Sequence, residues 1–413
     1  MARQEGGHVG KWTMTGAVCP AGGTGPCAGL RVLDLSTIVS GPLCGRILGD
    51  FGADVVKLEA VGGDMTRTMP PVYRGYSGYF AQYNRNKRGV AVDLKAPQGQ
   101  AIAQRLAARA DVVIENFRPG VAYRLGLDEA KLRPANAGLI YVSVNGFGDD
   151  GPYADQPAYD PVIQGLVGFM PMQGAGGPPS AMRNPVVDKI TAMSAALAIL
   201  AALNHRHVNG GAGQKINVPM LDAWAAFILP EFMAGHAFQN PDVPVTMPRD
   251  VYRTFKTRNG HVIGLVLQDN QFRGVCAALE LPEVAADPRF ASPVGRVENI
   301  EDLVAALSGP IAALTTAEFL ARARRHEVPF APVNDVEGFL ADPQVRHNSA
   351  YFDVEDPDFG TMRHLGFMAG FSATPSRLWR RAPRLGEHTD EVLCELGYAS
   401  DAIADLRAAG HVR

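Results

Sequence analysis

The chain has 413 residues, of which 46% are hydrophobic and 20% are charged, which is ordinary for a globular protein. Its net charge of −3 argues against general nucleic-acid binding, and its apolar runs are interrupted by polar residues before they reach membrane-spanning length. The five cysteines contain no CxxC pair, which argues against a zinc cluster or a disulfide framework and fits the cytoplasm. Residues 1–27 lack the apolar stretch of a signal peptide and are predicted to be a flexible extension.

The N-terminal half alternates short β-branched runs with helical patterns. The predicted strands are residues 31–35, 54–58, 89–94, 111–115, 139–144 and 214–218. The predicted helices between the first five are residues 42–51, 97–109 and 120–125. This alternation predicts a parallel sheet with helical crossovers, a Rossmann-like α/β domain over residues 28–224. No G-x-G-x-x-G follows the first strand, so a dinucleotide site lacks its main support.

The pattern changes after residue 224. Two short strands at 251–255 and 261–266 flank Arg258-Asn259-Gly260, which predicts a β-hairpin. Amphipathic helices are then predicted at residues 270–280, 300–305 and 316–325. Residues 225–335 are therefore predicted to form a smaller α+β domain with its linkers. Residues 336–413, which end in a helical patch near 389–396, are expected to return to the large domain.

Asp188 stands where a loop is predicted to become a helix, since residues 189–200 are mostly small and apolar. An Asp at the start of a helix faces the positive end of the helix dipole, which is expected to keep it ionised. An ionised carboxylate needs no base in order to act as a nucleophile. The same position suits an N-cap, which only satisfies backbone N–H groups, and this segment alone favours the cap.

Several motifs after residue 27 resemble, in order and spacing, those of the family III CoA-transferases, which include formyl-CoA and carnitine CoA-transferases. They are GLRVLDL at 29–35, LGDFGADVVKLE at 48–59, NRNKR at 84–88, ADVVIENFRPG at 110–120, RLG at 124–126 and PRLGEH at 383–388. Tyr159-Asp160 and Gln164-Gly165 precede Asp188 in the same order.

The resemblance implies that Asp188 is a catalytic nucleophile and not merely a cap. It would attack the thioester of an acyl-CoA donor to give a mixed anhydride, and the CoA thiolate would then form an aspartyl-CoA thioester. A carboxylic acid acceptor would reverse these steps and leave as the new acyl-CoA. The resemblance further implies CoA as a substrate, no permanently bound cofactor or metal, and an interlocked homodimer.

The resemblance also implies which residues contact CoA. Val39 and Ser40 are expected to line the CoA channel. The other expected contacts are Asn84, Arg85, Asn86, Lys87, Asn116, Phe117, Arg118, Arg124, Gln156, Pro157, Ala158 and Tyr159. Together with Arg88, the basic residues of this set are the cations that the phosphates of CoA need. For each basic residue taken singly, a solvated surface charge is the alternative.

Two departures from the family pattern narrow the function. Ala60 stands where formyl-CoA transferase has an arginine that contacts CoA, and residues 264–272 lack a glycine-rich loop, which disfavours formate or oxalate. One alternative is an α-methylacyl-CoA racemase, which needs a His before Asp160, where this chain has Tyr159. Tyrosine is a poor base at neutral pH. The other alternative is a non-catalytic CoA-binding protein, for which Asp188 would be dispensable.

Overall fold

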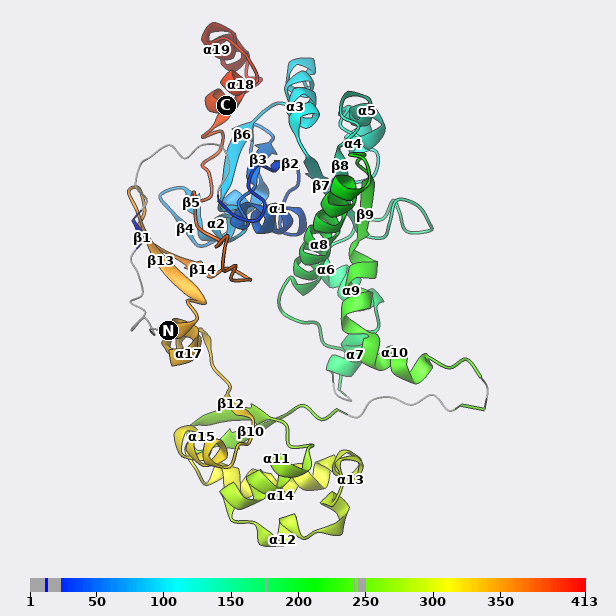
Figure 1. The fold of residues 1–413 in the computed structure, drawn as a ribbon, viewed down its shortest axis with the longest axis vertical. Coiled ribbons are helices and arrows are strands. Elements are labelled where there is room, and N and C mark those ends of the chain that lie inside the picture. The colour runs from blue at the N-terminus through cyan, green and yellow to red at the C-terminus, as the bar shows by residue number, and fades with distance from the viewer. Residues whose placement is uncertain (1–11, 14–23, 175–176, 241, 244–249) are drawn as a thin grey trace. The chain divides into compact units, whose positions relative to one another are not determined.

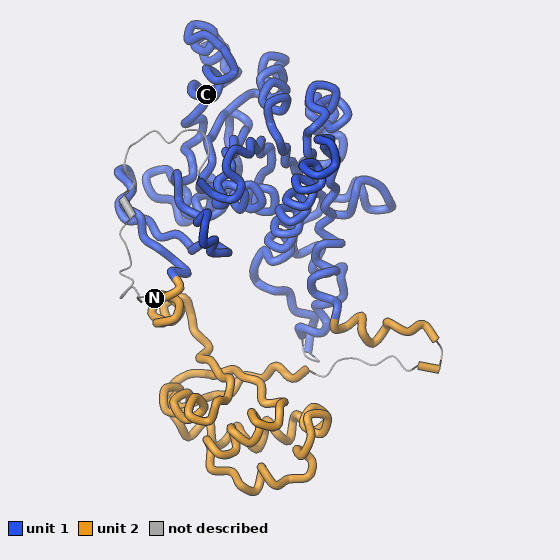
Figure 2. The backbone as a smooth tube through the Cα atoms, in the orientation of Figure 1, with its two compact units in different colours: residues 1–230, 349–413 blue, residues 231–348 orange. Residues whose placement is uncertain are grey.

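The computed structural model describes residues 12–13, 24–174, 177–240, 242–243 and 250–413. The chain divides into two compact units, which are the large unit, Met1–Pro230 with Ser349–Arg413, and the small unit, Glu231–Asn348 (Figure 2). The first boundary lies beyond the expected residue 224 because helix α9 (Met220–Ile228) continues past it and buries Trp224 fully. The second lies beyond residue 335 because two short helices, α16 and α17, belong to the small unit.

A 6-stranded parallel sheet forms the centre of the large unit, in the order β6-β3-β2-β7-β8-β9 (Figure 1). The bounds of its strands are β2 Arg31–Asp34, β3 Asp54–Glu59, β6 Lys87–Ala91, β7 Val112–Glu115, β8 Ile140–Asn145 and β9 Lys215–Pro219. The inner strands are rich in Val, Ile and Leu, as expected for strands covered on both faces. The chain builds one half of the sheet from β2 to β6 and the other half from β7 to β9, so the crossovers reverse between β2 and β7.

Helices cover both faces of this sheet. On one face, α1 (Ser40–Asp50) and α8 (Val186–Val208) share an apolar cluster with the strands. On the other face, α3 (Pro97–Arg109) packs with two helices of the C-terminal segment, α18 (Thr389–Glu395) and α19 (Ser400–Ala408). The end of the chain therefore completes the core of the large unit, as the sequence predicts.

Helix α8 is long and apolar enough to cross a membrane by length and composition. The sequence-based statement that polar residues keep this helix below membrane-spanning length is wrong, because they do not lower its mean hydropathy enough. The core helix of a globular protein can have the same length and composition. Ala192, Ala195 and Ile199 of α8 are fully buried in the cluster shared with α1 and the sheet.

The large unit contains further short elements. Its remaining helices are α2 Gly78–Asn84, α4 Val121–Arg124, α5 Glu129–Leu132, α6 Asp160–Leu166 and α7 Phe169–Gln173, with 3-10 turns at Met65–Thr68 and Arg133–Ala135. Its hairpins are β4 (Val72–Tyr73) with β5 (Tyr76–Ser77), and β13 (Tyr351–Asp356) with β14 (Gly360–Leu365). Strand β1 (Trp12–Thr13), inside the predicted flexible extension, pairs in parallel with β13. Most of that extension lies outside the described residues.

The small unit is an α+β structure with a 3-stranded antiparallel sheet, in the order β10-β11-β12. Its strands are β10 Arg253–Thr257, β11 Gly260–Gly264 and β12 Phe330–Pro332. Its helices are α11 Asp269–Leu279, α12 Pro282–Ala285, α13 Pro293–Glu298, α14 Ile300–Ala312, α15 Thr316–Arg325, α16 Val336–Ala341 and α17 Pro343–His347, with 3-10 turns at Ala234–His236 and Pro288–Phe290. Helix α10 (Pro230–Met233) spans the boundary between the units.

Candidate active site

A cavity of about 310 Å³, here called the carboxyl-edge cavity, opens at the carboxyl ends of the parallel strands. The loops after β2 and β7 both line it, so it lies where the crossovers reverse, and open α/β sheets bind ligands at such a point. Most of the predicted site residues line this cavity. They are Ser40, Asn116, Phe117, Arg118, Gln156, Pro157, Ala158, Tyr159 and Asp188.

Asp188 is the third residue of α8, which begins at Val186 and has no side-chain cap of its own. Instead, Asp160 Oδ2 accepts hydrogen bonds from the backbone N–H groups of Val187 (2.7 Å) and Asp188 (3.1 Å). Asp160 is in turn held by the Gln164 amide, whose Nε2 donates to its Oδ1 at 2.6 Å. The capping role considered for Asp188 therefore belongs to Asp160, and the Asp188 carboxylate is left to face the cavity.

Three influences set the pKa of the Asp188 carboxyl. Burial raises it most, the neighbouring Asp160 carboxylate raises it further, and a hydrogen bond from the Ser40 hydroxyl lowers it, so the pKa lies at about 6. The sequence-based expectation that the helix dipole simply keeps this group ionised is therefore corrected. The group is still mostly ionised at pH 7, and a carboxylate with a raised pKa is more basic and so a better nucleophile.

Two tyrosines of α2 lie near Asp188. The Tyr79 and Tyr83 rings are 5.1 Å apart. Burial raises the pKa of both phenols, and the charge of Asp188 raises it further. The sequence analysis predicts no helix at residues 78–84, so it did not predict that these two tyrosines share one face of α2.

Ile38, in the loop after β2, has a positive φ of 71°. This backbone conformation is unfavourable for a β-branched residue and costs roughly 1–3 kcal/mol. Ile38 lines the carboxyl-edge cavity beside Ser40 and Asp188. Such strain at a cavity wall must be held in place by neighbouring groups.

Lys87 and Asn84, two predicted CoA contacts, lie inside the protein and away from this cavity. Lys87 Nζ donates to Asp34 at 2.7 Å, to the Pro42 carbonyl at 2.7 Å and to the Asn84 amide oxygen at 2.9 Å. Burial lowers the pKa of Lys87 to about 8, although Asp34 opposes this shift. With all three ammonium donors occupied, Lys87 has none left for a phosphate, and both residues have a packing role here.

Arg85 and Asn86, also predicted to contact CoA, fasten the C-terminal segment to the sheet instead. Arg85 forms a buried ion pair of 2.8 Å with Asp50 and donates to the Leu365 carbonyl at 2.5 Å. Asn86 Oδ1 accepts a hydrogen bond from the backbone N–H of Trp379 at 2.6 Å. Sequence reasoning assigned both residues to CoA because the partners that they have here are distant along the chain.

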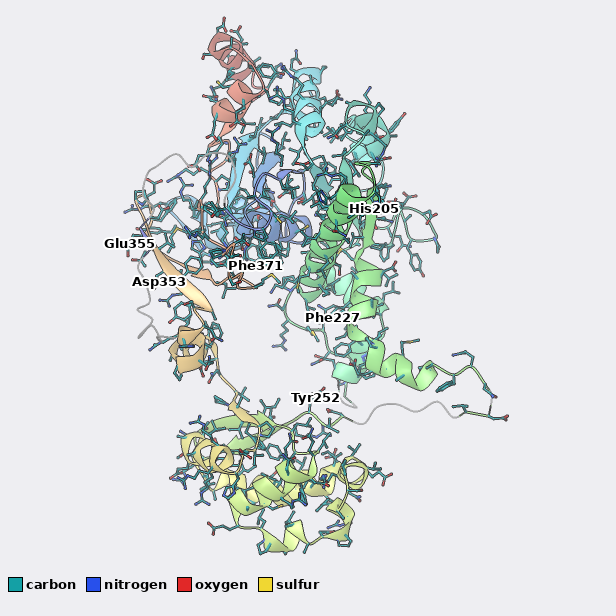
Figure 3. The ribbon with its side chains drawn as sticks, viewed as in Figure 1. His205, Phe227, Tyr252, Asp353, Glu355 and Phe371 are labelled. Carbon is teal, nitrogen blue, oxygen red and sulfur yellow. The ribbon has the colours of Figure 1, made fainter. Side chains whose placement is uncertain are left out.

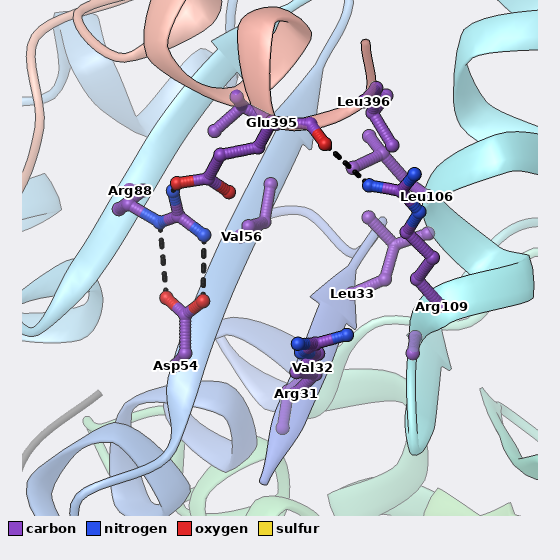
Figure 4. A pocket seen from close by; sticks show the side chains of 12 residues that line it. Arg31, Val32, Leu33, Asp54, Val56, Arg88, Leu106, Arg109, Glu395 and Leu396 are labelled. Carbon is purple, nitrogen blue, oxygen red and sulfur yellow. Dashed lines mark hydrogen bonds and ion pairs between the residues drawn. The ribbon is translucent and has the colours of Figure 1, made fainter. Parts of the chain in front are cut away.

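Arg88 lines a different cavity of about 340 Å³, here called the amino-edge cavity, which includes the starts of β2 and β3 (Figure 4). It pairs with Asp54 at 2.6 Å and with Glu395 at 2.7 Å. Arg31 and Arg109 also line this cavity. Arg88 therefore lines the edge of the sheet opposite to Asp188, and its guanidinium is already paired.

The remaining predicted residues also lie outside the wall of the carboxyl-edge cavity. Val39 is buried and precedes the first residue of α1. Arg124 is exposed at the end of α4, and Ala60 is exposed just after β3.

A second cavity of about 280 Å³ adjoins the carboxyl-edge cavity and shares Phe117, Arg118 and Asn145 with it. Its wall also includes Tyr123 and Lys215, which sequence reasoning missed. Lys215 begins β9 beside Tyr141 of β8, and its ammonium pairs with Asp149, in the loop after β8, at 2.5 Å.

None of the described residues that line either of these two cavities is a histidine. At the position where a racemase would carry its histidine, Tyr159 lines the carboxyl-edge cavity and is 55% exposed. This arrangement favours acyl transfer over proton transfer at an α-carbon.

Comparisons with known proteins agree with this site. A family model described as CoA-transferase family III matches residues 27–389. The chain is 36% identical over 386 residues to the succinate–glutarate CoA-transferase of Agrobacterium fabrum, covering 90% of this chain and 96% of that protein. It is 32% identical over 396 residues to the succinyl-CoA–D-citramalate CoA-transferase of Chloroflexus aurantiacus, covering 93% of this chain and 97% of that protein.

A solved structure leads to the same family. The crystal structure of a CAIB/BAIF family protein from Brucella suis superimposes with a TM-score of 0.79 and 34% identity, covering 90% of this chain and 99% of that one. The α/β fold with its parallel sheet is thus shared over nearly the whole length. On the family match and these relatives, the chain is an enzyme that belongs to CoA-transferase family III.

Proposed function

We propose that this enzyme moves CoA between dicarboxylic acids, with Asp188 as the nucleophile that carries the acyl group. Succinate or succinyl-CoA, glutarate and D-citramalate appear in the names of the relatives. All are four- or five-carbon dicarboxylic acids or CoA thioesters of such acids. The observation that carries the proposal is the Asp188 carboxylate in the wall of a cavity, with a pKa of about 6.

The reaction would proceed through two covalent intermediates. An Asp188 oxygen attacks the thioester carbonyl of the donor, the C–S bond breaks, and CoA leaves as the thiolate from a mixed anhydride. The thiolate then attacks the Asp188 carbonyl carbon, which releases the donor acid and leaves an aspartyl-CoA thioester. The acceptor carboxylate attacks this thioester and regenerates an anhydride, from which the thiolate takes the new acyl group and frees Asp188.

The two adjoining cavities offer room for the two ends of CoA. In this proposal the thioester end lies in the carboxyl-edge cavity beside Asp188. The nucleotide end lies in the adjoining cavity beside Tyr123 and Lys215. Arg118 lines both and is exposed, and in this proposal its guanidinium binds a phosphate where they meet.

Exposed apolar side chains on α6, α8 and α9 support the proposal of a homodimer. Val162 and Leu166 on α6 are 49% and 47% exposed, Leu197 on α8 is 67% exposed, and Phe227 on α9 (Figure 3) is 55% exposed. A second copy of the chain would cover this surface, since large exposed apolar patches mark interaction sites. Light scattering of the purified protein would overturn the proposal if it gave the mass of one chain.

Trapping during turnover tests the nucleophile. Hydroxylamine added during exchange should convert the aspartyl thioester to a hydroxamate on Asp188, which peptide mass spectrometry would locate. Normal exchange with an unmodified Asp188 would refute the mechanism. A non-catalytic CoA-binding protein would show no exchange at all.

The acceptor is tested by a panel of acids with succinyl-CoA as the donor. Four- and five-carbon dicarboxylates should be accepted better than formate, oxalate or monocarboxylates of equal length. In a parallel reaction in deuterated water, α-deuteration of an (R)-2-methylacyl-CoA without any acceptor would favour the racemase instead.

A further inference from the structure

Asn116 is predicted from sequence to contact CoA, but its amide is occupied by the backbone of the loop after β2. Its Oδ1 accepts a hydrogen bond from the Thr37 N–H at 2.8 Å, and its Nδ2 donates to the Thr37 carbonyl at 2.8 Å. One amide thus satisfies both backbone groups of a single residue, which fixes the plane of that part of the loop. One Nδ2 hydrogen is used in this way, so a contact with CoA would compete with this pairing.

The residues on either side of Thr37 are held in the same manner by other side chains. Lys57 Nζ donates to the Ser36 carbonyl at 2.8 Å, and Asp64 Oδ2 accepts from the Ile38 N–H at 3.1 Å. Lys57 and Asp64 also pair with each other at 3.3 Å, and both side chains are fully buried.

Three consecutive loop residues are therefore held by three side chains from two other segments, β3 with the loop that follows it and the end of β7. This pattern explains how Ile38 keeps a φ of 71°. A loop with a strained residue relaxes unless its neighbours determine its shape, and here each neighbour does so through a directed hydrogen bond. The loop is thus built for one conformation.

The held loop leads directly to the nucleophile. Ser40 comes two residues after Ile38, is buried, and is the first residue of α1. Ser40 and Asp188 line the same cavity, and the Ser40 hydroxyl lowers the pKa of the Asp188 carboxyl as a hydrogen-bond donor does. The position of this donor depends on the path of residues 36–39, because they lead the chain from β2 into the first residue of α1.

We infer that Asn116 is a positioning residue, which with Asp64 and Lys57 holds the Ser36–Ile38 backbone so that Ser40 contacts the nucleophile. This inference rests on the proposed role of Asp188. It assigns Asn116 to the geometry of the reacting carboxylate and not to CoA recognition. The two roles predict different kinetics, since a positioning residue affects kcat and a CoA contact affects binding.

The test compares Asn116→Ala with the wild-type enzyme in three measurements. The kcat of CoA transfer should fall about 10- to 100-fold, the size expected when a reacting group is slightly misplaced. The dissociation constant of free CoA should stay within about twofold. The acid limb of the kcat/KM profile should move to higher pH by about half a pH unit or more, because a carboxylate that loses a hydrogen bond is protonated more easily.

The direction of that pH shift is diagnostic because the groups around Asp188 are known. Asp160 on α6, Ser40 on α1, and Tyr79 and Tyr83 on α2 all interact with it. Of these, only Ser40 lowers the pKa of Asp188 by donating a hydrogen bond. Loss of the Ser40 contact therefore moves the limb upward, and Ser40→Ala should reproduce the shift.

Coupling to Ser40 separates positioning from a general loss of structure. In the Ser40→Ala background, Asn116→Ala should lower kcat by less than about threefold, since both changes break one chain of contacts. Asn116→Asp, which keeps the acceptor for the Thr37 N–H, should retain more activity than Asn116→Ala. A full and additive loss in the double variant would overturn the inference, as would a raised CoA dissociation constant with an unchanged acid limb.

Asn136 provides a matched control at the other end of the sheet, where its Nδ2 donates to the Ala110 carbonyl at 2.7 Å. Asn136→Ala removes a comparable hydrogen bond and should leave kcat and the acid limb unchanged. Failure of the proposed function is recognised separately, because then the wild-type enzyme itself yields no hydroxamate on Asp188. If the wild type yields this adduct and Asn116→Ala forms it at the same rate, the positioning role is refuted.

Discussion

The cavities at the two edges of the parallel sheet are similar in size but differ in how their charges are balanced. Their volumes are about 310 Å³ at the carboxyl edge and about 340 Å³ at the amino edge. At the amino edge, Arg88 is paired with the carboxylates of Asp54 and Glu395 (Figure 4). At the carboxyl edge, the charge that acts most strongly on Asp188 is the like charge of Asp160.

This contrast shows that volume and basic residues do not by themselves identify a site. A charge that is neutralised inside the protein stabilises the fold and has little left to offer a ligand. A carboxylate held beside another carboxylate has a raised pKa and is ready to react. In the proposed function, the edge that reacts is therefore the one where the protein leaves charge unbalanced.

Replacing a carboxylate at each edge should give the largest difference in kcat, since only Asp188 is proposed to react. Asp188→Asn should lower kcat at least about 10³-fold, because it removes the covalent route, while CoA binding is retained. The matched change Asp54→Asn at the amino edge should leave kcat within about threefold, since Arg88 keeps Glu395. Turnover and CoA titration by calorimetry measure both effects. Retention of a tenth of the activity by Asp188→Asn would contradict the comparison.

Removing one arginine from each edge sharpens the comparison for binding. Arg118→Ala should raise the KM for acyl-CoA about 10- to 100-fold, the effect of losing a hydrogen bond between two charged groups. Arg109→Ala, at the amino-edge cavity, should leave that KM unchanged. Steady-state kinetics with varied donor at saturating acceptor would separate them. Equal effects of the two variants would mean that CoA is not bound at the carboxyl edge.

Acid should lower the CoA-transfer activity while the protein stays folded. The pKa of Asp188 is about 6, so the reactive carboxylate is lost as the pH falls below this value. For one ionisation, kcat/KM should decrease about tenfold per pH unit on the acid side. Circular dichroism at each pH controls for unfolding. A profile that stays flat down to pH 5 would rule out Asp188 as the group that must be ionised.

The smallest expected effect is on stability. Asp188→Asn, which should abolish activity, should make the folded protein more stable. Because the folded-state pKa of Asp188 is raised, the native protein binds this proton more tightly than the unfolded chain does. Its ionised form therefore destabilises the fold above about pH 6, and the penalty disappears near pH 4. Asp188→Asn should raise the Tm by about 2–4 °C at pH 7.5 and leave it unchanged at pH 4. Differential scanning fluorimetry at both values would check this, and a Tm that falls at pH 7.5 would contradict it.

The regular elements follow from local patterns that the sequence displays. Helix α3 is predicted with its observed bounds because Pro97 suits the first turn and the pattern stops at Ala110. Helix α15 is likewise predicted, since Thr315 and Glu318 form a capping box. The short β-branched runs also predict the parallel strands to within a few residues.

A site residue can be predicted from the sequence only where its position along a single helix or strand decides its role. Asp188 is singled out by its place at the start of a helix that the sequence displays, and its proposed role as nucleophile comes from the resemblance to the family. The ion pair of Lys87 with Asp34 cannot be predicted from the sequence, because Asp34 belongs to another strand and the pairing depends on the sheet order. For the same reason the pairing of Asn116 with Thr37 becomes visible only when the loops after β2 and β7 lie side by side.

The hydrogen bond from the Trp379 N–H to Asn86 attaches the C-terminal segment beside strand β6. This segment is made last, which has a consequence during protein synthesis. The large unit draws its residues from Met1–Pro230 and from Ser349–Arg413, whereas the small unit is one continuous stretch. As the chain leaves the ribosome, the small unit is therefore complete before the large one has received its last helices. Until then, the edge of strand β6 is uncovered, and nascent chains at this stage are the ones most exposed to aggregation.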